Sequence, residues 1–460
     1  MPEAPDQSHA FGGGASDSAF SPIVLAAMVI TIVAVLILPR KYQLVCFLCF
    51  ICLAPAGQQI YVAGVHWFLS RLIILVAWGR LLAGKFSPKK DLAGGLTSID
   101  KYFFYCFVIQ AVCVSLIYMQ GQAIVNQVGF LIDFVGCYFF LRTLIRTKED
   151  MFTAIKCLAV ICLILGVFML REQMTMQNAF GLLGGVRPVP EVREGKIRSQ
   201  GAFQHSLMAG CFAATLVPLF FMLWKNGKAK LLACVGFVGC SVMTYTSQSS
   251  TPLLAYVSGI LAMGMWPIRK HMQLVRRGIV ATILGLAMVM KAPVWFIIAH
   301  IDLTGGSSGY HRAELIDQFV RHFWNWWLIG TKDAGTWAYD LWDTQNQYVN
   351  VGENGGLLAF VLFIAIIVGC FKGIGKARRS LAGTGRDQWL PWFLGAALFA
   401  HLVGFFGVNY FDQSKVGFFV ALCMVPVVSE VAKAAGIARP KATAAVEIQS
   451  AGASAPALRS

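Results

Sequence analysis

Two groups of cationic side chains stand out as residues that could bind an anion. The first lies just before an apolar segment and comprises Arg193, Lys196 and Arg198. The second is Arg312, which falls in the middle of the apolar stripe of a predicted amphipathic helix over 311–330. Guanidinium groups bind phosphates through paired hydrogen bonds, and a desolvated guanidinium without a partner is costly. These residues are anion-site candidates. Pairing of the first group with neighbouring glutamates, or of Arg312 with a carboxylate or the membrane interface, is the structural alternative.

Asp343 and Asn346 could handle the proton of a hydroxyl group. They are three residues apart, so one helical turn would place both side chains on the same face. A carboxylate can accept a proton, and an amide can orient the group that loses it. Asp and Asn are also preferred at helix N-caps. An ordinary N-cap for the apolar segment that begins near residue 347 is therefore the alternative interpretation.

These polar clusters lie between apolar segments long enough to cross a lipid bilayer. Of 460 residues, 57% are hydrophobic and 13% charged, whereas about a quarter are charged in ordinary soluble domains. This composition excludes a soluble enzyme, a secreted disulfide scaffold and a disordered chain. We predict an all-α polytopic transmembrane helix bundle of about 12–13 spans, because helices satisfy their own backbone hydrogen bonds in lipid. Predicted spans lie near 22–38, 43–60, 66–84, 102–119, 127–145, 151–170, 203–224, 231–247, 252–268, 278–299, 347–371, 388–408 and 415–434.

The formal net charge of +16 is distributed unevenly along the chain. Lysine and arginine gather in alternate connections and in the C-terminal tail. The positive-inside rule then places the C-terminus in the cytoplasm and two long loops, 171–202 and 300–346, on the extracytoplasmic side. Membrane topology accounts for the basic residues, so nucleic acid is not an expected partner. The predicted organisation is a polar N-terminal tail (1–21), a transmembrane domain (22–434) and a disordered cytoplasmic tail (435–460).

The cysteines predict neither a disulfide framework nor a metal site. All 13 cysteines fall in or beside the predicted spans, and none lies in the two long loops. Cys46, Cys49 and Cys52 have a spacing that metal clusters use, but small packing residues in an apolar helix are the favoured interpretation.

Several short motifs occur in an order that resembles the O-antigen ligase and polysaccharide polymerase superfamily of bacterial inner-membrane glycosyltransferases. The resemblance covers roughly residues 195–370. Its pieces are Arg198-x-x-Gly201-x-Phe203 entering a span, the Ser/Thr-rich break at 246–252, Arg312 opening an outer-loop helix, Trp327-x-x-Gly330, and Asn346-x-Tyr348…Glu353-x-Gly355-Gly356 entering the next span.

The resemblance implies a multi-pass enzyme of the bacterial inner membrane whose reactive loops are extracytoplasmic. In this family a glycan carried on undecaprenyl diphosphate is transferred to a sugar hydroxyl of a lipid A core or of a growing glycan. The reaction needs no nucleotide, metal or other cofactor. Outer-loop arginines bind the diphosphate in the family, which assigns that role to Arg198 and Arg312. We add Arg193, His205 and Tyr348 as further substrate-binding candidates.

One position departs from the family pattern. The residue before the motif asparagine, a histidine widely taken as the base, is Gln345 here, and an amide cannot accept a proton at neutral pH. Asp343 is the nearest substitute, His311 is a further catalytic candidate, and Asn346 would orient the hydroxyl. A transporter or flippase of lipid-linked glycans and a non-catalytic partner in polysaccharide assembly remain as alternatives. Few ionisable residues within the spans, and no internal repeat, favour chemistry over transport.

Overall fold

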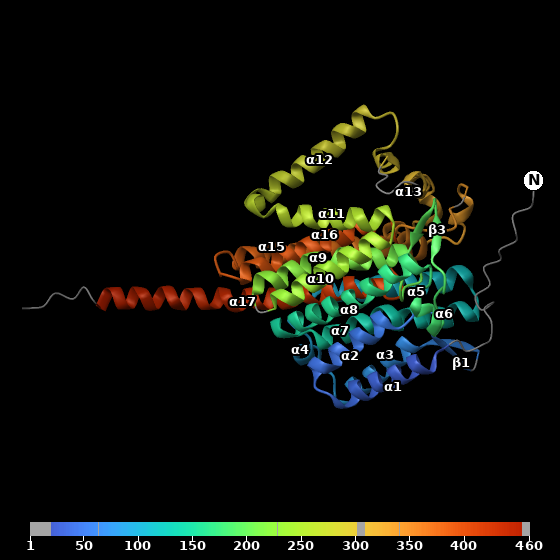
Figure 1. The fold of residues 1–460 in the computed structure, drawn as a ribbon. Coiled ribbons are helices and arrows are strands. Elements are labelled where there is room, and N and C mark those ends of the chain that lie inside the picture. Colours follow the sequence, from blue (N-terminus) through green and yellow to red (C-terminus); the bar gives the residue numbers. More distant parts are fainter. Residues whose placement is uncertain (1–19, 63, 228, 301–308, 340, 453–460) are drawn as a thin grey trace, which may run out of the picture.

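The computed structural model describes residues 20–62, 64–227, 229–300, 309–339 and 341–452. Within these ranges the chain is almost entirely helical, and its strands form two short antiparallel hairpins. The helices run side by side as a bundle (Figure 1). Seven of them are long and apolar enough to cross a membrane. The chain is therefore a multi-pass membrane protein, and the predicted all-α bundle is confirmed.

A helix overlaps each of the thirteen predicted spans. Three of these helices, α1, α10 and α11, are apolar but have only 15–17 residues. The helices in question are α1 (Pro22–Ile37), α2 (Arg40–Leu53), α3 (Leu69–Ala83), α5 (Ser98–Tyr118), α6 (Gly121–Leu131) continued by the π-turn η1 (Ile132–Gly136) and α7 (Cys137–Leu144), α8 (Lys148–Thr175), α9 (Ser206–Asn226), α10 (Lys230–Thr246), α11 (Ser250–Gly264), α12 (Met272–Val289), α15 (Gln347–Ser380), α16 (Leu390–Gly404) and α17 (Ser414–Gly452).

The second predicted span ends earlier than expected. Helix α2 stops at Leu53, and the chain turns through the hairpin of β1 (Gln59–Val62) and β2 (Val65–Phe68) before α3. Pro55 follows the helix end at once, and proline lacks the N–H that a helix needs. A Cβ on Gly57 would lie 2.3 Å from the carbonyl oxygen of Gly185. The turn therefore packs tightly against the first long loop.

The last helix is longer than predicted. Helix α17 continues to Gly452, whereas the expected span ends at 434 and the expected disordered tail begins at 435. The predicted polar N-terminal tail, residues 1–21, lies almost wholly outside the described residues, which begin at Phe20.

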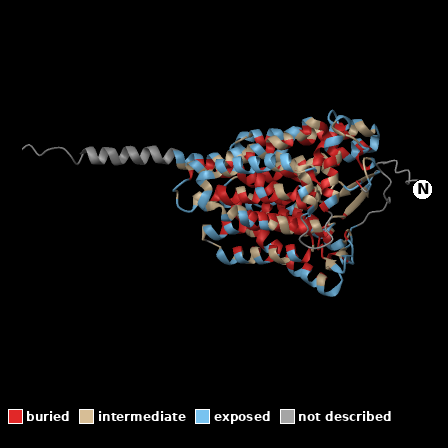
Figure 2. Ribbon diagram, turned by 90° about the horizontal axis from the view of Figure 1, so that it is seen from above, coloured by how far each residue is buried: buried red, intermediate tan, exposed pale blue. Residues whose placement is uncertain are grey.

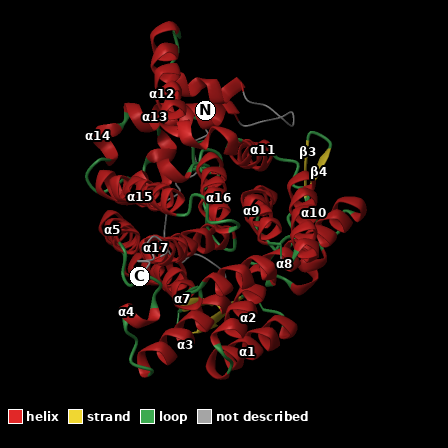
Figure 3. Cartoon of the chain, turned by 90° about the vertical axis from the view of Figure 1, so that its left-hand side faces the viewer, coloured by secondary structure: helices red, strands yellow, loops and turns green. Residues whose placement is uncertain are grey.

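The apolar core follows the centre of the bundle. In their most apolar stretches 89% of α9 and 83% of α17 are buried, whereas no residue of the corresponding stretch of α12 is. Figure 2 shows the same gradient from a buried centre to an exposed periphery. Helices α10 and α11 both pack against α9 (Figure 3). Helix α9 thus forms a central support, while α12 stands apart from the bundle (Figure 1).

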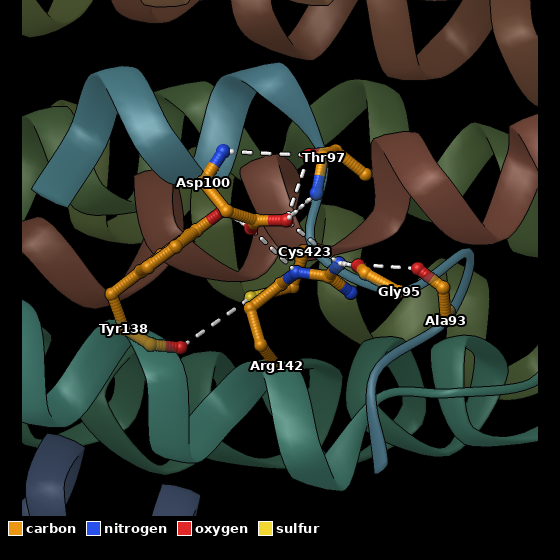
Figure 4. Close-up of polar contacts among 7 residues, drawn as sticks. All are labelled: Ala93, Gly95, Thr97, Asp100, Tyr138, Arg142 and Cys423. Atoms are coloured by element: carbon orange, nitrogen blue, oxygen red, sulfur yellow. Dashed lines mark hydrogen bonds and ion pairs between the residues drawn. The ribbon is translucent and has the colours of Figure 1, made fainter. Parts of the chain in front are cut away.

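A buried ion pair ties α5 to α7 at the end of the bundle that carries α4 (Pro88–Asp91). Arg142 Nε donates to Asp100 Oδ1 over 2.9 Å, and its Nη2 donates to the carbonyl oxygen of Ala93 over 3.1 Å. The hydroxyl of Tyr138 donates to the same carboxylate over 2.6 Å, and Thr97 completes a capping box with Asp100 (Figure 4). Neither charged side chain is exposed. Each charge therefore depends on its partner.

The two long loops lie at the opposite end and contain short elements (Figure 1). The first holds the 3₁₀ turn η2 (Ala179–Leu183) and the hairpin of β3 (Glu191–Arg193) and β4 (Lys196–Arg198). The second holds α13 (Gly309–Arg321), α14 (Phe323–Trp326) and η5 (Ala334–Thr336). Further 3₁₀ turns are η3 (Trp266–His271), η4 (Val294–His300) and η6 (Asp387–Trp389).

The predicted single helix over 311–330 is divided in two. Leu315 and Phe319 are buried as expected, but Val320 is exposed. Asp317, which the pattern places on the polar face, is buried because it accepts hydrogen bonds from Trp295 Nε1 and Arg321 Nε. The apolar pattern therefore identifies the buried face of α13 but not the end of that helix.

Candidate functional site

A cavity of about 350 Å³ opens where the two long loops meet. Its wall combines the β3–β4 hairpin, the beginning of α9, the break between α10 and α11, helix α13, the segment before α15, and the connection between α16 and α17. The lining residues are Arg187, Glu191, Arg193, Lys196, Arg198, His205, Ser206, Leu207, Met208, Gln248, Ser249, Ser250, Arg312, Asp343, Gln345, Val408, Asn409 and Phe411.

The wall of this cavity is strongly cationic. Two carboxylates face five cations along the wall, namely Glu191 and Asp343 against Arg187, Arg193, Lys196, Arg198 and Arg312. A concave, partly apolar surface with excess positive charge concentrates anions. The two cationic groups that the sequence singles out are therefore parts of one anion-attracting cavity.

Arg312 is the most buried of the cavity cations, with 8% of its surface exposed. Its Nε has no hydrogen-bond partner, and Arg312 forms no ion pair with any residue that the structure describes. Burial, helped by the nearby charges of Arg193 and Arg198, lowers the pKa of Arg312 below its usual value. A bound anion would supply the compensating charge that the protein itself does not.

Arg198 owes its position to the hairpin. The turn residues Glu194 and Gly195 have φ angles of 51° and 73°, which a two-residue turn with both φ angles positive requires. This register places Arg198 opposite Glu191, and the two side chains form an ion pair of 3.4 Å. The alternative interpretation, that this basic group pairs with neighbouring glutamates, is thus partly right. Arg198 Nε nevertheless remains buried without a partner. Burial lowers the pKa of Arg198, and the charge of Glu191 opposes that effect.

Asp343 lines the same cavity as these cations, on an exposed segment. Its Oδ2 accepts a hydrogen bond of 2.6 Å from Gln345 Nε2. The following hydroxyl, of Thr344, donates to Glu353 Oε2 over 2.8 Å and fixes the segment to α15. His311 Nε2 lies 3.4 Å from the carbonyl oxygen of Asp343, although His311 does not line the cavity.

Asn346 and Tyr348 do not line the cavity. The predicted helical turn over 343–346 is absent, since α15 begins at Gln347 and Asn346 is its N-cap. Asn346 Oδ1 accepts from the backbone N–H groups of Tyr348 and Val349 over 2.9 and 3.2 Å. The Tyr348 hydroxyl donates to the carbonyl oxygen of Leu402. The N-cap interpretation of Asn346 is correct, and both side chains hold α15 in place.

His205 does line the cavity, as an exposed residue directly before α9. Its ring meets that of Phe411 edge to face, with 6.4 Å between the ring centroids. Of the eight predicted site residues, the cavity therefore gathers Arg193, Arg198, His205, Arg312 and Asp343.

Two of the sequence motifs pack against each other. Thr331 N–H donates to the carbonyl oxygen of Glu353 over 2.8 Å. Gly330 has a φ angle of 93°, and a Cβ there would lie 2.0 Å from that same oxygen. Gly356, with φ 66°, breaks α15 and would place a Cβ 2.5 Å from the carbonyl oxygen of Leu328. Glycine is required at both positions, and the contact anchors the second long loop to α15.

The connection between α16 and α17 contributes wall residues that the sequence interpretation did not find. Asn409 and Phe411 line the cavity, whereas the predicted span 388–408 ends just before them. The polar run from Asn409 to Gln413 was the available signal, since such a run interrupts an apolar segment. Arg187 was also missed, because it stands alone and outside the basic cluster that ends at Arg198.

No protein-family model matches the chain, and a comparison with curated proteins of described function gives no match either. The family resemblance drawn from the motifs therefore stays a prediction.

Proposed function

We propose that the chain is a membrane glycosyltransferase of the O-antigen ligase and polysaccharide polymerase type. It transfers a glycan from undecaprenyl diphosphate to a sugar hydroxyl at the outer face of the bacterial inner membrane. The observation that carries the proposal is the cavity in which the buried, unpaired Arg312 shares a wall with Arg198 and the carboxylate of Asp343. The reaction requires cations that stabilise the anionic leaving group and a base that accepts the proton of the hydroxyl.

The arginines act on the donor. Arg198 and Arg312 bind the diphosphate through charge-assisted hydrogen bonds from their planar guanidinium groups. The bond between the anomeric carbon and the diphosphate oxygen breaks, and its electron pair passes to the diphosphate. The cations stabilise the charge that develops there. Arg193 and His205, on the same wall, are positioned to contact the glycan or its phosphates.

Asp343 acts on the acceptor. The acceptor hydroxyl oxygen bonds to the anomeric carbon from the side opposite the leaving diphosphate, so one displacement inverts the anomeric centre. The hydroxyl proton passes to the carboxylate of Asp343. Gln345 holds Oδ2 by its hydrogen bond, which leaves Oδ1 to accept the proton. Asn346 and His311 act as positioning residues, one at the start of α15 and the other beside the Asp343 peptide.

The location of the ionisable residues supports chemistry over transport. Transporters place unpaired charges and broken helices near the membrane midplane. Arg71 and Asp133, which belong to predicted spans, form an ion pair of 2.7 Å with each other. The cavity at one end of the bundle, in contrast, is lined by more cations than carboxylates and includes the unpaired Arg312.

Deleting the protein from its cell and analysing the surface glycans tests the proposal. Loss of long glycan chains would identify a polymerase, and complete chains left on the lipid carrier would identify a ligase. Unchanged surface glycans together with an unchanged pool of lipid-linked glycan would contradict the proposal.

A further inference from the structure

A groove between three helices lies at the end of the bundle opposite the cationic cavity. Helix α15 packs against both α5 and α17 (Figure 3), and residues of all three helices line one hollow of about 420 Å³. The connection between α4 and α5 contributes Gly94 and Thr97 to its wall. The groove and the cationic cavity share no lining residue. The groove is therefore separate from the candidate site described above.

Two glycines of α15 form the floor of this groove. A Cβ on Gly369 would lie 3.2 Å from Cγ1 of Ile99 on α5, and a Cβ on Gly373 would lie 3.3 Å from Cγ1 of Val425 on α17. Helix α15 thus comes close to both neighbours at these positions. Because glycine has no side chain, the space between the three helices stays open.

The lining changes from apolar to polar toward the end of the bundle. Ala365 and Val368 line the deeper part, and Lys372 lines the mouth. Helix α15 has no charged residue from Gly355 to Phe371, and Lys372 follows directly. At 1.5 Å per residue this uncharged stretch spans about 25 Å, most of the roughly 30 Å hydrocarbon core of a bilayer. Lys372 therefore lies at the level where the hydrocarbon core meets the lipid head groups.

The mouth of the groove carries an excess of positive charge. Glu430 accepts a hydrogen bond of 2.7 Å from Lys433, so these two charges in the groove lining neutralise each other. Lys372 forms no ion pair with any residue that the structure describes. Three further cations follow on α15 within 376–379. Basic pockets between transmembrane helices attract anionic lipid head groups.

The side of the groove opens toward the lipid. Val368 and Tyr102 both line it and are 42% and 37% exposed. Val368 belongs to the uncharged stretch of α15, so its exposed surface faces hydrocarbon. An occupant that fills the whole groove therefore needs an anionic part at the membrane surface and an apolar part inside the bilayer.

We infer that this groove binds an anionic glycerophospholipid. The lipid phosphate lies beside Lys372, and one acyl chain follows Val368 and Ala365 toward the membrane interior. Charge complementarity selects an anionic lipid, because a zwitterionic head group brings a cation of its own to a mouth that is already positive. The bound lipid contacts α5, α15 and α17 together and stabilises their packing. This lipid belongs to the leaflet at the α4 end, and its binding does not depend on glycan transfer.

Lipid binding to the purified full-length protein in detergent can be counted by native mass spectrometry. The probes are phosphatidylglycerol and phosphatidylcholine with the same acyl chains. We expect the wild type to retain phosphatidylglycerol several-fold more tightly. Lys372→Gln removes one charge at an exposed position and should lower this preference several-fold. Lys376→Gln, one turn further along the same helix and outside the groove, is the matched control and should keep it.

A filled groove tests where the acyl chain lies. Val368→Trp places a large ring over the apolar part, and Val361→Trp, at an exposed α15 position outside the groove, is the matched control. A ligand that binds the folded state raises the Tm, so phosphatidylglycerol should raise the Tm of the wild type and of Val361→Trp. Val368→Trp should lose most of this rise. Glycerol 3-phosphate, which has the phosphate but no acyl chain, should leave the wild-type Tm unchanged.

Equal retention of the two lipids by the wild type, or a preference that Lys372→Gln leaves intact, would overturn the inference. A rise in Tm that persists in Val368→Trp, or that glycerol 3-phosphate reproduces, would also overturn it, because the groove would then hold no acyl chain. The Tm of each variant without added lipid shows that it is folded. None of these measurements uses glycan transfer, so they stand whether or not the proposed function is correct.

Discussion

Gln345 donates a hydrogen bond from Nε2 to Oδ2 of Asp343 over 2.6 Å. The residue at the position where the resembled family has a histidine therefore contacts the carboxylate that we assign as the base. An amide donor fixes the orientation of a carboxylate without competing for its proton. This contact gives a physical reason for a glutamine beside a catalytic aspartate, which the sequence alone presents only as a departure.

Asp343→Asn should abolish detectable transfer, because the variant keeps the shape of the side chain but cannot accept a proton. General-base assistance is typically worth about 10²–10⁴-fold in rate. The measurement is the initial rate of glycan transfer in proteoliposomes at equal protein content. Asp333→Asn is the control, since Asp333 is exposed on the same loop and does not line the cavity. Wild-type rates in Asp343→Asn would direct attention to His311 or His205.

Gln345→Ala should reduce the rate without abolishing it. The variant removes one hydrogen bond to a charged group, which is worth about 1.5–3 kcal/mol, or roughly ten- to a hundredfold in rate. The donor KM should stay near its original value, because Gln345 orients the base in this account. A large increase in donor KM with an unchanged kcat would show that Gln345 binds the glycan instead.

Arg312→Lys should weaken use of the donor even though the charge is kept. Lysine lacks the planar fork that binds a diphosphate with two parallel hydrogen bonds. A titration of lipid-linked donor should give a higher KM and a lower kcat. Arg276→Lys, on α12 outside the cavity, is the matched control. A titration curve for Arg312→Lys that overlays the wild type would remove Arg312 from the site.

The sequence predicted the all-α bundle and the positions of its helices well, because hydropathy is a local property. It also predicted that Arg312 lies on the buried face of its helix, since that follows from a helical period. The meeting of Arg198, Arg312 and Asp343 depends on how distant segments pack, and only the motif order pointed to it. Asn346 was ambiguous because the same amide suits an N-cap and a substrate contact. The α16–α17 connection was missed because it is a short link between two predicted spans, and the sequence does not show that it packs beside the two long loops.

Arg142→Ala should destabilise the fold more than the loss of an exposed ion pair. It leaves the buried carboxylate of Asp100 without its partner, which costs about 3–5 kcal/mol. Thermal unfolding in detergent should show a clearly lower Tm. Lys433→Ala breaks an exposed pair with Glu430, a type of pair worth about 0–1 kcal/mol, and should leave the Tm nearly unchanged. Equal shifts for the two variants would show that the Arg142 pair is not important for stability.

Asp412 should make the fold less stable as the pH rises. This residue lies between α16 and α17, and burial raises its pKa to about 6, with the charge of Lys415 opposing the shift. The folded state holds the Asp412 proton more tightly than the unfolded state does. Protonation of Asp412 therefore contributes stability that is fully present below about pH 4 and is lost as the pH rises through 6. Asp412→Asn should raise the Tm at pH 7 and have little effect at pH 4. The φ angle of 46° at this position is one that asparagine tolerates.

The opposite dependence, with Asp412→Asn lowering the Tm at pH 7, would mean that the ionised carboxylate stabilises the fold through Lys415.

The most direct test of the account is transfer by the purified protein in proteoliposomes supplied with an undecaprenyl-diphosphate-linked glycan and a glycan acceptor. We expect free undecaprenyl diphosphate and the elongated acceptor to appear in equal amounts, and Arg312→Lys and Asp343→Asn each to suppress both products. Wild-type protein that binds this donor at the cationic cavity but releases no undecaprenyl diphosphate, with either a lipid A-core or a glycan acceptor, would contradict it.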